Sequence, residues 1–423
     1  MEDALQSSVY VSSPEFAGWL MKKGFRWRKL WKKRWVALHG AEIVYMDMEP
    51  TVDNAASMTI TKAEITSASV IDRDDADGDP NGFAIHINDG NQPTWHLRAE
   101  TVREKKSWIM RLMHVHAIVR WLEDFEKVRV LGVGGTGIVY ELLHKTNGSR
   151  FAMKEMEIKN RTQMKMAVSE AVMLKDIMEN VSHPNIMHIE RVFQVGSKFY
   201  LVFPMCFGGE LYEHIIKRGH FTEHDAATIS RDLVSGLHAL HEHDILHLDI
   251  KPENILFDSN DEDAKIKITD FGLSKMFSTE DQTRQNNAFS MKLMQDKLGA
   301  FLESGETYKE QLRGTIGYMS PELILTGHCS KATDVFAAGV VLYILLCGRP
   351  PFNSKSNREV LERTAKGVYK ISGGEWDAIS PDAKDLVQRM LQSNPLERIS
   401  TAQILAHPWL QHLDEDNDEV GEL

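Results

Sequence analysis

Two short segments of the 423-residue sequence contain side chains suited to moving a phosphoryl group. Residues 247–254 read HLDIKPEN, which places Asp249 and Asn254 five positions apart, and residues 270–272 read DFG. A carboxylate can orient an attacking hydroxyl and accept its proton, whereas carboxylate and amide oxygens are suitable ligands for magnesium. The strand-like runs NILF and KIKITDFG flank an acidic turn, so a hairpin is expected to bring Asn254 and Asp270 together.

A glycine-rich segment upstream is suited to holding phosphates. LGVGGTGIVY contains Gly132, Gly134 and Gly137, and glycine lets backbone N–H groups approach anionic oxygens closely. Dinucleotide-binding folds use the same spacing, but they place an acidic residue about 20 positions further on. Here RFAMKEME places Lys154 downstream instead, and Lys154 with Lys251 would supply positive charge for the transferred group. A flexible glycine-rich hairpin with a surface lysine is the alternative for this segment.

With Ser320-Pro321-Glu322, these motifs make residues from about 125 to 410 resemble a eukaryotic protein kinase catalytic domain. GGELYEHI, RGTIGYMSPEL, CGRPPF and AHPWL look most similar to the calcium/calmodulin-dependent kinase group. The resemblance implies a bilobal α+β fold, with a small β-rich lobe and a larger α-helical lobe, that uses ATP and Mg²⁺. Lys251, two positions after Asp249, is the form found in serine/threonine kinases, so the expected substrate is a protein with a Ser or Thr acceptor.

The same resemblance implies roles for individual residues. The catalytic set comprises Asp249, Lys251, Lys154 and Glu170, and the metal ligands are Asn254 and Asp270. The nucleotide is expected to lie among Leu131, Gly132, Gly134, Gly137, Val139, Ala152, Lys154, Phe203, Pro204, Cys206 and Glu210. Substrate contacts are assigned to Glu210, Glu253 and Thr315, and the two glutamates favour a basic residue upstream of the acceptor. Thr315 also matches the loop threonine that hydrogen-bonds the catalytic aspartate, here Asp249. Solvated surface acids are the alternative for Glu170, Glu210 and Glu253.

The sequence departs from the usual kinase pattern at two places. Leu248 stands where most such kinases have the arginine that grips a phosphate on the activation loop, so phosphorylation there should order the loop less. The segment from Asp270 to Glu322 is long and includes AFSMKLMQDKLGAFLES, whose apolar residues follow helical spacing. This insertion is interpreted either as a surface feature or as an apolar helix that docks on the catalytic cleft or on a partner. Arg398 is expected to form a structural pair with Glu322.

A basic run near the N-terminus contrasts with the net charge of −12 of the whole chain. GWLMKKGFRWRKLWKKRWVAL contains eight Lys and Arg residues and no acid, and Lys32 and Arg34 are two apart, hence on one face of a strand. Residues from about 14 to 120 resemble a pleckstrin homology (PH) domain, with Gly18-Trp19-Leu20 opening the first strand and Trp108 in the closing helix. The resemblance implies a β-barrel with a C-terminal helix and phosphoinositide binding by Lys22, Lys32 and Arg34. Protein binding is the alternative for this domain.

Composition limits the remaining possibilities. The anionic balance argues against a general nucleic-acid coat, and three widely spaced cysteines argue against a disulfide framework or a zinc cluster. The N-terminus lacks the features of a signal peptide, and the longest apolar stretch, residues 335–348, fits a buried helix rather than a membrane span. The expected location is the cytoplasm, with reversible recruitment to membranes. Calmodulin control from the C-terminal side is not expected, because no regulatory helix is evident after Leu410.

The predicted organisation is a PH-like domain at residues 14–120, a protein kinase domain at 126–410 and an acidic tail at 411–423. The predicted function is an ATP-dependent Ser/Thr kinase recruited to, or regulated at, phosphoinositide membranes. The alternative is a catalytically inactive kinase fold that serves as a membrane-attached scaffold. The connector, about residues 117–125, is too short for independent domains, so membrane recruitment, rather than loop phosphorylation alone, is expected to relieve inhibition.

Overall fold

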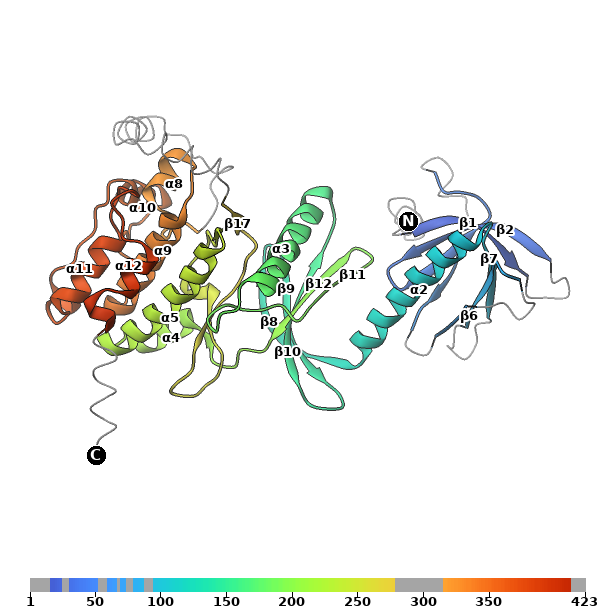
Figure 1. Ribbon diagram of the computed structural model, residues 1–423, viewed down its shortest axis with the longest axis horizontal. Coiled ribbons are helices and arrows are strands. Elements are labelled where there is room, and N and C mark those ends of the chain that lie inside the picture. The colour runs from blue at the N-terminus through green and yellow to red at the C-terminus, as the bar shows by residue number, and fades with distance from the viewer. Residues whose placement is uncertain are drawn as a thin grey trace. The chain divides into compact units, whose positions relative to one another are not determined.

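The computed structural model describes residues 16–24, 30–51, 59–66, 69–73, 79–86, 94–277 and 315–411. The chain forms two compact units, which are described separately. The first comprises Met1–Lys165 and Glu190–Phe203, and the second comprises Met166–Ile189 and Pro204–Leu423. Figure 1 shows a first unit rich in strands and a second unit rich in helices. The predicted multidomain fold class, a β-rich N-terminal part followed by a mostly helical part, is confirmed.

The first seven strands form one antiparallel sheet in the order β4-β3-β2-β1-β7-β6-β5. Their bounds are Phe16–Lys23 (β1), Trp31–His39 (β2), Glu42–Met46 (β3), Thr61–Glu64 (β4), Val70–Asp72 (β5), Gly82–His86 (β6) and Trp95–Arg98 (β7). The predicted hairpin over residues 35–46 is present as β2 and β3, which turn at Gly40 with a φ of 62°. Glycine tolerates this left-handed conformation because it has no Cβ.

One long helix, α2 (Val102–Glu123), follows this sheet. It begins at Thr101, whose side chain accepts a hydrogen bond from the N–H of Glu104 at 3.1 Å, the usual device for capping a helix N-terminus. Its apolar face, which includes Trp108 and Leu112, packs into the core of the sheet. The helix predicted from Val102 is present, but it continues through most of the stretch that the sequence suggested as a connector.

A second antiparallel sheet of the first unit has five strands in the order β11-β12-β10-β9-β8. Their bounds are Phe125–Gly134 (β8), Gly137–His144 (β9), Arg150–Glu157 (β10), Arg191–Val195 (β11) and Lys198–Pro204 (β12). Strand β12 ends at Pro204, where the chain passes from the first unit into the second. This sheet contains the glycine-rich segment as the turn between β8 and β9.

The second unit is mostly helical. Its helices are α3 (Arg161–Asn180, which starts in the first unit), α4 (Leu211–Arg218), α5 (Glu223–Glu242), α8 (Pro321–Thr326), α9 (Lys331–Cys347), α10 (Asn357–Ala365), α11 (Pro381–Met390) and α12 (Thr401–Leu405), with short 3₁₀ turns η2 (Pro252–Asn254) and η3 (Gly374–Asp377). Every residue of α9 from Thr333 to Cys347 is buried. The apolar stretch at 335–348 therefore forms a core helix, as predicted. Among the described residues, no helix is both long and apolar enough to cross a membrane.

Two small sheets of the second unit hold the predicted catalytic segments. One has the order β13-β15-β16, and the other pairs β14 with β17. Their bounds are Gly209–Glu210 (β13), Ile245–Leu246 (β14), Ile255–Phe257 (β15), Ile266–Ile268 (β16) and Lys275–Met276 (β17). The apolar insertion at residues 288–304 and the acidic tail from residue 412 lie outside the described residues.

Candidate active site

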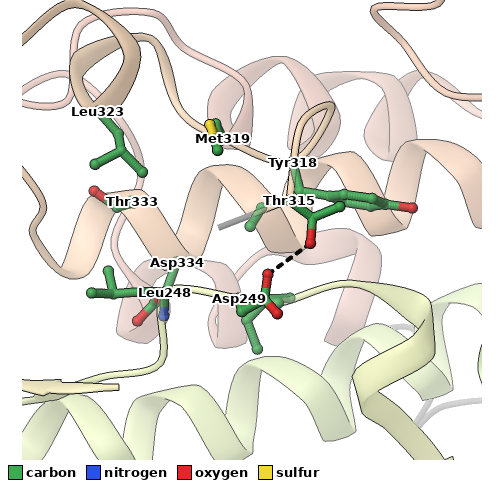
Figure 2. A pocket seen from close by; sticks show the side chains of 10 residues that line it. Leu248, Asp249, Thr315, Tyr318, Met319, Leu323, Thr333 and Asp334 are labelled. Carbon is green, nitrogen blue, oxygen red and sulfur yellow. Dashed lines mark hydrogen bonds between the residues drawn. The ribbon is translucent and has the colours of Figure 1, made fainter. Parts of the chain in front are cut away.

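The carboxylate of Asp249 is held by three neighbouring side chains. The Thr315 hydroxyl donates to Oδ1 at 2.9 Å, and Figure 2 shows these two side chains pointing toward one another. Lys251 Nζ donates to Oδ2 at 2.7 Å and to the Thr315 hydroxyl at 2.9 Å. Asn254 Nδ2 also donates to Oδ2, at 3.1 Å. With Asp249 only 9% exposed, its carboxylate is fixed in one orientation beside a positive charge.

A buried aspartate fixes the loop on which Asp249 lies. Asp334, on core helix α9, accepts the backbone N–H of His247 at 2.9 Å and that of Leu248 at 2.8 Å. These bonds satisfy backbone donors that would otherwise be buried without a partner. Leu248 has a φ of 66°, a conformation that costs a non-glycine residue about 1–2 kcal/mol and persists where the surroundings enforce it. The loop is therefore positioned by the most apolar helix of the second unit.

Asn254 and Asp270 lie at the same end of the β15–β16 hairpin. Ile255 pairs with Ile268, and the N–H of Thr269 donates to the Asn254 carbonyl at 2.9 Å. The hairpin predicted from the sequence is thus present. Because Asn254 Nδ2 donates to the Asp249 carbonyl and carboxylate, its amide oxygen is the atom that could ligate a metal ion.

The oxygen chemistry of Asn254 and Asp270 fits Mg²⁺, which commonly binds one or two carboxylates together with substrate phosphates. Such a site needs few protein ligands. Among the residues that the structure describes, no cluster of three or more His, Cys, Asp or Glu side chains could hold a metal ion. Asn254 and Asp270 would supply two such oxygen ligands.

The DFG turn lies against the carboxylate of Glu170. Asp270 has a φ of 61°, and its Oδ1 accepts the Gly272 N–H at 3.3 Å. A Cβ atom on Gly272 would lie 3.2 Å from Asp270 Oδ1 and 3.7 Å from Glu170 Oε2. Glu170 lies on α3 and is 5% exposed, so it is a buried acid rather than the solvated surface residue that was the alternative.

In the first unit, the register of the second sheet aligns the predicted nucleotide residues. Lys154 on β10 lies opposite Val139 on β9, and Val139 lies opposite Gly132 on β8. Directly opposed residues project to the same face of a sheet, so Lys154 and Val139 share a face with Ala152, two positions from Lys154. Leu131, Gly134 and Gly137 complete the β8–β9 hairpin, where Gly134 pairs with Gly137.

Phe203, Pro204 and Cys206, predicted to contact adenine, are half-buried at and after the end of β12. Burial raises the pKa of the Cys206 thiol to about 11. The thiol is therefore uncharged at neutral pH, which suits contact with an apolar ring face rather than with phosphate.

Two acids of the predicted substrate site belong to an acidic group near the catalytic loop. Burial raises the pKa of Glu210, and the negative charges of Glu213 and Glu253 raise it further, whereas Lys251 opposes the shift. One carboxylate oxygen of Glu253 is buried and makes no hydrogen bond. Neither glutamate is a fully solvated surface acid, and an incoming cation would relieve the repulsion within the group.

Leu248, the residue in the usual arginine position, is directed into an apolar cluster. It is 6% exposed and packs with Leu246, Phe277 and Cys329. It also lines a pocket beside Asp249 together with Met319 and Leu323, as Figure 2 shows. An apolar side chain at this position cannot make the charge-assisted hydrogen bonds by which an arginine binds a phosphate, which is the basis of the expectation from the sequence.

The predicted lipid residues lie on one face of the β1–β2 hairpin. Lys22 is paired with Lys32, and Leu20 with Arg34, so all these side chains project to the same side. Lys32 is exposed, and Arg34 forms an ion pair with Asp47 at 2.8 Å. Three further cations of the basic run, Arg26, Arg28 and Lys29, lie outside the described residues.

Lys22 is unlike its two neighbours because it is only 4% exposed. Its amine lies 4.5 Å from the ring centroid of Tyr45 and 5.1 Å from that of Trp95. Burial, followed by repulsion from Arg34, lowers the pKa of Lys22 to about 8. Sequence reasoning missed these aromatic partners. The sequence did contain one indication of Tyr45. Alternate residues of a strand lie on the same face, so Tyr45 shares a face with Ile43 on β3.

Comparison with known proteins agrees with this geometry. Residues 125–410 match the protein kinase domain model, which is more than half of the chain, and residues 14–117 match the PH domain model. The chain therefore belongs to the protein kinase family and has an N-terminal PH domain. Both predicted resemblances are confirmed.

Relatives of the chain include calcium-dependent protein kinases. The chain is 36% identical over 283 residues to calcium-dependent protein kinase 12 of Arabidopsis thaliana, an alignment that covers 67% of this chain and 52% of the relative. It is 36% identical over 287 residues to calcium-dependent protein kinase 5 of Plasmodium falciparum, covering 68% and 45%. The chain thus spans about half the length of the curated relatives that it matches.

Proposed function

We propose that this chain is an ATP- and Mg²⁺-dependent serine/threonine protein kinase. The observation that supports this most strongly is the buried carboxylate of Asp249, which contacts Lys251, Thr315 and Asn254 at once. A merely structural aspartate has no need of a lysine and a metal-ligating amide beside it. An active kinase needs a carboxylate, a cation and a metal ligand at one place.

In the proposed mechanism, Asp249 orients the acceptor hydroxyl and takes its proton as the hydroxyl oxygen bonds to the γ-phosphorus of ATP. The bond from that phosphorus to the β,γ-bridging oxygen breaks at the same time, and ADP leaves. Lys251, at 2.7 Å from Asp249, places a positive charge where negative charge develops on the transferred group. Asn254 and Asp270 would hold magnesium, and the glycine-rich hairpin would hold the phosphates. Lys154 and Glu170 complete the catalytic set that the kinase resemblance implies. When bound, ATP supplies the phosphoryl group, and Mg²⁺ neutralises part of its charge.

The test is transfer of the terminal phosphate of ATP to a Ser- or Thr-containing peptide, with the native chain and an Asp249→Asn variant side by side. The competing function is a catalytically inactive scaffold, and a scaffold would give equal, background transfer in both. Loss of transfer in the variant alone supports the kinase.

The acidic group of Glu210, Glu213 and Glu253 supports a preference for substrates with a basic residue upstream of the acceptor. Changing Glu253→Gln is expected to lower kcat/KM for an Arg-containing peptide about tenfold or more, because a charge-assisted hydrogen bond contributes roughly 1.5–3 kcal/mol. The same peptide with Ala in place of Arg should be phosphorylated equally by both chains. Steady-state kinetics on the two peptides checks this.

The matched control is Glu262→Gln, which removes the same charge from an exposed residue of the β15–β16 turn. Its kinetics should equal those of the native chain. An equal loss with both peptides in Glu253→Gln would show that Glu253 does not select for Arg.

We also propose that the PH domain binds a phosphoinositide at Lys22, Lys32 and Arg34 and recruits the chain to membranes. The three cations share one face, as a single polyanionic headgroup requires. The amine of Lys22 has lost most of its hydration, so a bound phosphate would stabilise its charged form. The buried position of Lys22 indicates that Lys32 and Arg34 are the better residues to substitute in a test.

Changing Lys32→Gln together with Arg34→Gln is expected to weaken vesicle binding by about 3 kcal/mol or more, roughly 100-fold in Kd, because each charge-assisted hydrogen bond to a headgroup phosphate contributes about 1.5–3 kcal/mol. Phosphotransfer to a soluble peptide should remain. Co-sedimentation with phosphoinositide vesicles measures the first quantity, and a peptide assay measures the second.

The same strands offer a matched control on their other face. Changing Lys23→Gln with Lys33→Gln removes two charges from the β1–β2 hairpin, but these residues are opposed to Trp31 and Met21 on the opposite side of the sheet. This pair of changes should weaken binding much less. Equal losses from both pairs would contradict a headgroup site and indicate general attraction to an anionic surface.

A further inference from the structure

The residues between the two family matches form part of both domains. The PH match ends at residue 117 and the kinase match begins at 125, which leaves residues 118–124 in neither. In the structure, α2 continues to Glu123, and β8 begins at Phe125. Asp124 is therefore the single residue between a helix of the PH domain and the first strand of the kinase domain.

The N-terminal part of α2 belongs to the PH domain core. Trp108, Ile109, Leu112 and Val115 pack in one cluster with inward residues of the first sheet. Trp108 is fully buried, and its ring centroid lies 4.6 Å from that of Phe16. This part of the helix cannot rotate or shift without disturbing the close packing of the core.

The C-terminal turn of the same helix belongs to the kinase domain. The ring of Trp121 lies 4.3 Å from that of Phe125 and 5.3 Å from that of Phe193, measured between centroids. The guanidinium of Arg191 on β11 lies over the Trp121 ring at 5.6 Å. Leu122 packs against the same cluster. Trp121 thus contacts both β8 and β11, the two edge strands of the five-stranded sheet.

Backbone hydrogen bonds hold the connection between α2 and β8. The N–H of Asp124 donates to the carbonyls of Arg120 and Trp121, each at 3.2 Å, and its own carbonyl accepts the Lys145 N–H at 2.9 Å. Lys145 directly follows β9, so this bond ties the end of α2 to the β8–β9 hairpin. The other end of that hairpin is the glycine-rich turn, beginning at Gly132. A shift of α2 would therefore reach the glycine-rich hairpin through packed side chains and hydrogen bonds rather than through a flexible linker.

We propose that Trp121 is a positioning residue for the glycine-rich hairpin and that it couples this hairpin to the PH domain. Occupation of the PH domain by anionic lipid then changes nucleotide affinity, and nucleotide changes lipid affinity by the same factor, as thermodynamic linkage requires. The lipid half of this coupling rests on the proposed phosphoinositide binding. The positioning half does not, because it concerns only Trp121, β8 and β11.

The experiment uses the full chain in native, Trp121→Ala and Trp121→Phe forms. Without vesicles, Trp121→Ala is expected to raise KM for ATP at least fivefold while kcat for a saturated reaction changes little, and Trp121→Phe should restore KM because a ring remains between Phe125 and Phe193. With phosphoinositide vesicles, KM of the native chain should change at least fivefold. In Trp121→Ala that change should disappear, although the vesicles still bind.

The matched control is Met110→Ala, an exposed position of the same helix, which should behave as the native chain does. Thermal melting of each variant identifies simple unfolding. If Trp121→Ala unfolds, the Trp121→Leu variant, which keeps bulk without a ring, is expected to raise KM in its place.

An unchanged KM in the folded variant, or a vesicle effect that survives in it, would overturn the proposal. Absence of vesicle binding by the native chain would refute the lipid assignment and the coupling, and the KM comparison without vesicles would still decide the positioning role.

Discussion

The Asp249→Asn variant is expected to transfer phosphate about 10²–10⁴-fold more slowly than the native chain, the range by which a positioned general base accelerates a reaction. Asparagine keeps the shape of the side chain but cannot accept the proton of the acceptor hydroxyl. One of the two carboxylate oxygens also becomes an NH2 donor, so either Lys251, 2.7 Å from the native carboxylate, or the Thr315 hydroxyl loses its acceptor. Steady-state transfer from ATP to a Ser peptide measures kcat.

The loss should appear in kcat rather than in KM for ATP, because Asp249 contacts the acceptor and not the nucleotide in the proposed mechanism. Asp261→Asn, at an exposed position of the β15–β16 turn, is the matched control and should be as active as the native chain. Equal rates for native and Asp249→Asn chains would remove the catalytic role of this residue.

The second large effect concerns stability. Arg398 and Glu322 form a fully buried pair, with both side chains 0% exposed and two parallel contacts of 2.8 and 2.9 Å. Changing Arg398→Met is expected to lower the free energy of unfolding by about 3–5 kcal/mol, because it leaves the Glu322 carboxylate buried without its counter-charge. Urea unfolding followed by intrinsic fluorescence measures this loss.

A second substitution separates this explanation from lost packing. In the double variant Glu322→Met with Arg398→Met no uncompensated charge remains, so it should be more stable than Arg398→Met alone. Arg389→Met removes a 58% exposed arginine from its ion pair with Asp385 and should cost less than about 1 kcal/mol. A loss below about 1 kcal/mol in Arg398→Met would contradict the buried-pair account.

Local patterns were sufficient to predict much of the catalytic loop. The runs that flank the acidic turn predicted a hairpin, and the structure pairs Ile255 with Ile268 there. The contact of Thr315 with Asp249 was implied by the kinase resemblance, and its hydroxyl lies 2.9 Å from that carboxylate. These features depend on short-range pairing or on a strongly constrained motif, and both leave a signal in the sequence.

The environment of Lys22 could not be predicted in the same way. Its assignment to the lipid site followed from the PH resemblance, but its burial depends on Tyr45 and Trp95, which belong to strands remote in sequence. Those strands meet β1 only through the register of the whole sheet, in which Lys22 is paired with Leu97 on β7. Alternation in the sequence predicts the face of a strand on which a side chain lies. The residues that it contacts on that face depend on pairing with strands distant in sequence.

The contacts of Trp121 could not be predicted for a related reason. The sequence predicts a closing helix of the PH domain that reaches Leu122, but about residues 117–125 are also interpreted as a connector between the two domains. The helical spacing of the preceding residues in fact continues to Glu123, and Trp121 packs against Phe193, which is distant in sequence. Motifs place the boundary between the two domains inside α2. The N-terminal part of this helix packs in the PH domain core, whereas its C-terminal turn packs against the kinase domain.

We expect this chain to transfer the terminal phosphate of ATP to a protein hydroxyl. This transfer is measured by incorporation of labelled phosphate into a defined peptide. The peptide has one Ser with an upstream Arg, and a partner peptide has Ala in place of that Ser. With Mg²⁺ and the native chain, label should enter the first peptide on Ser and should be absent from the second. If the native chain, in the presence and in the absence of phosphoinositide vesicles, incorporates no more label than Asp249→Asn, the account of this protein as a kinase is contradicted.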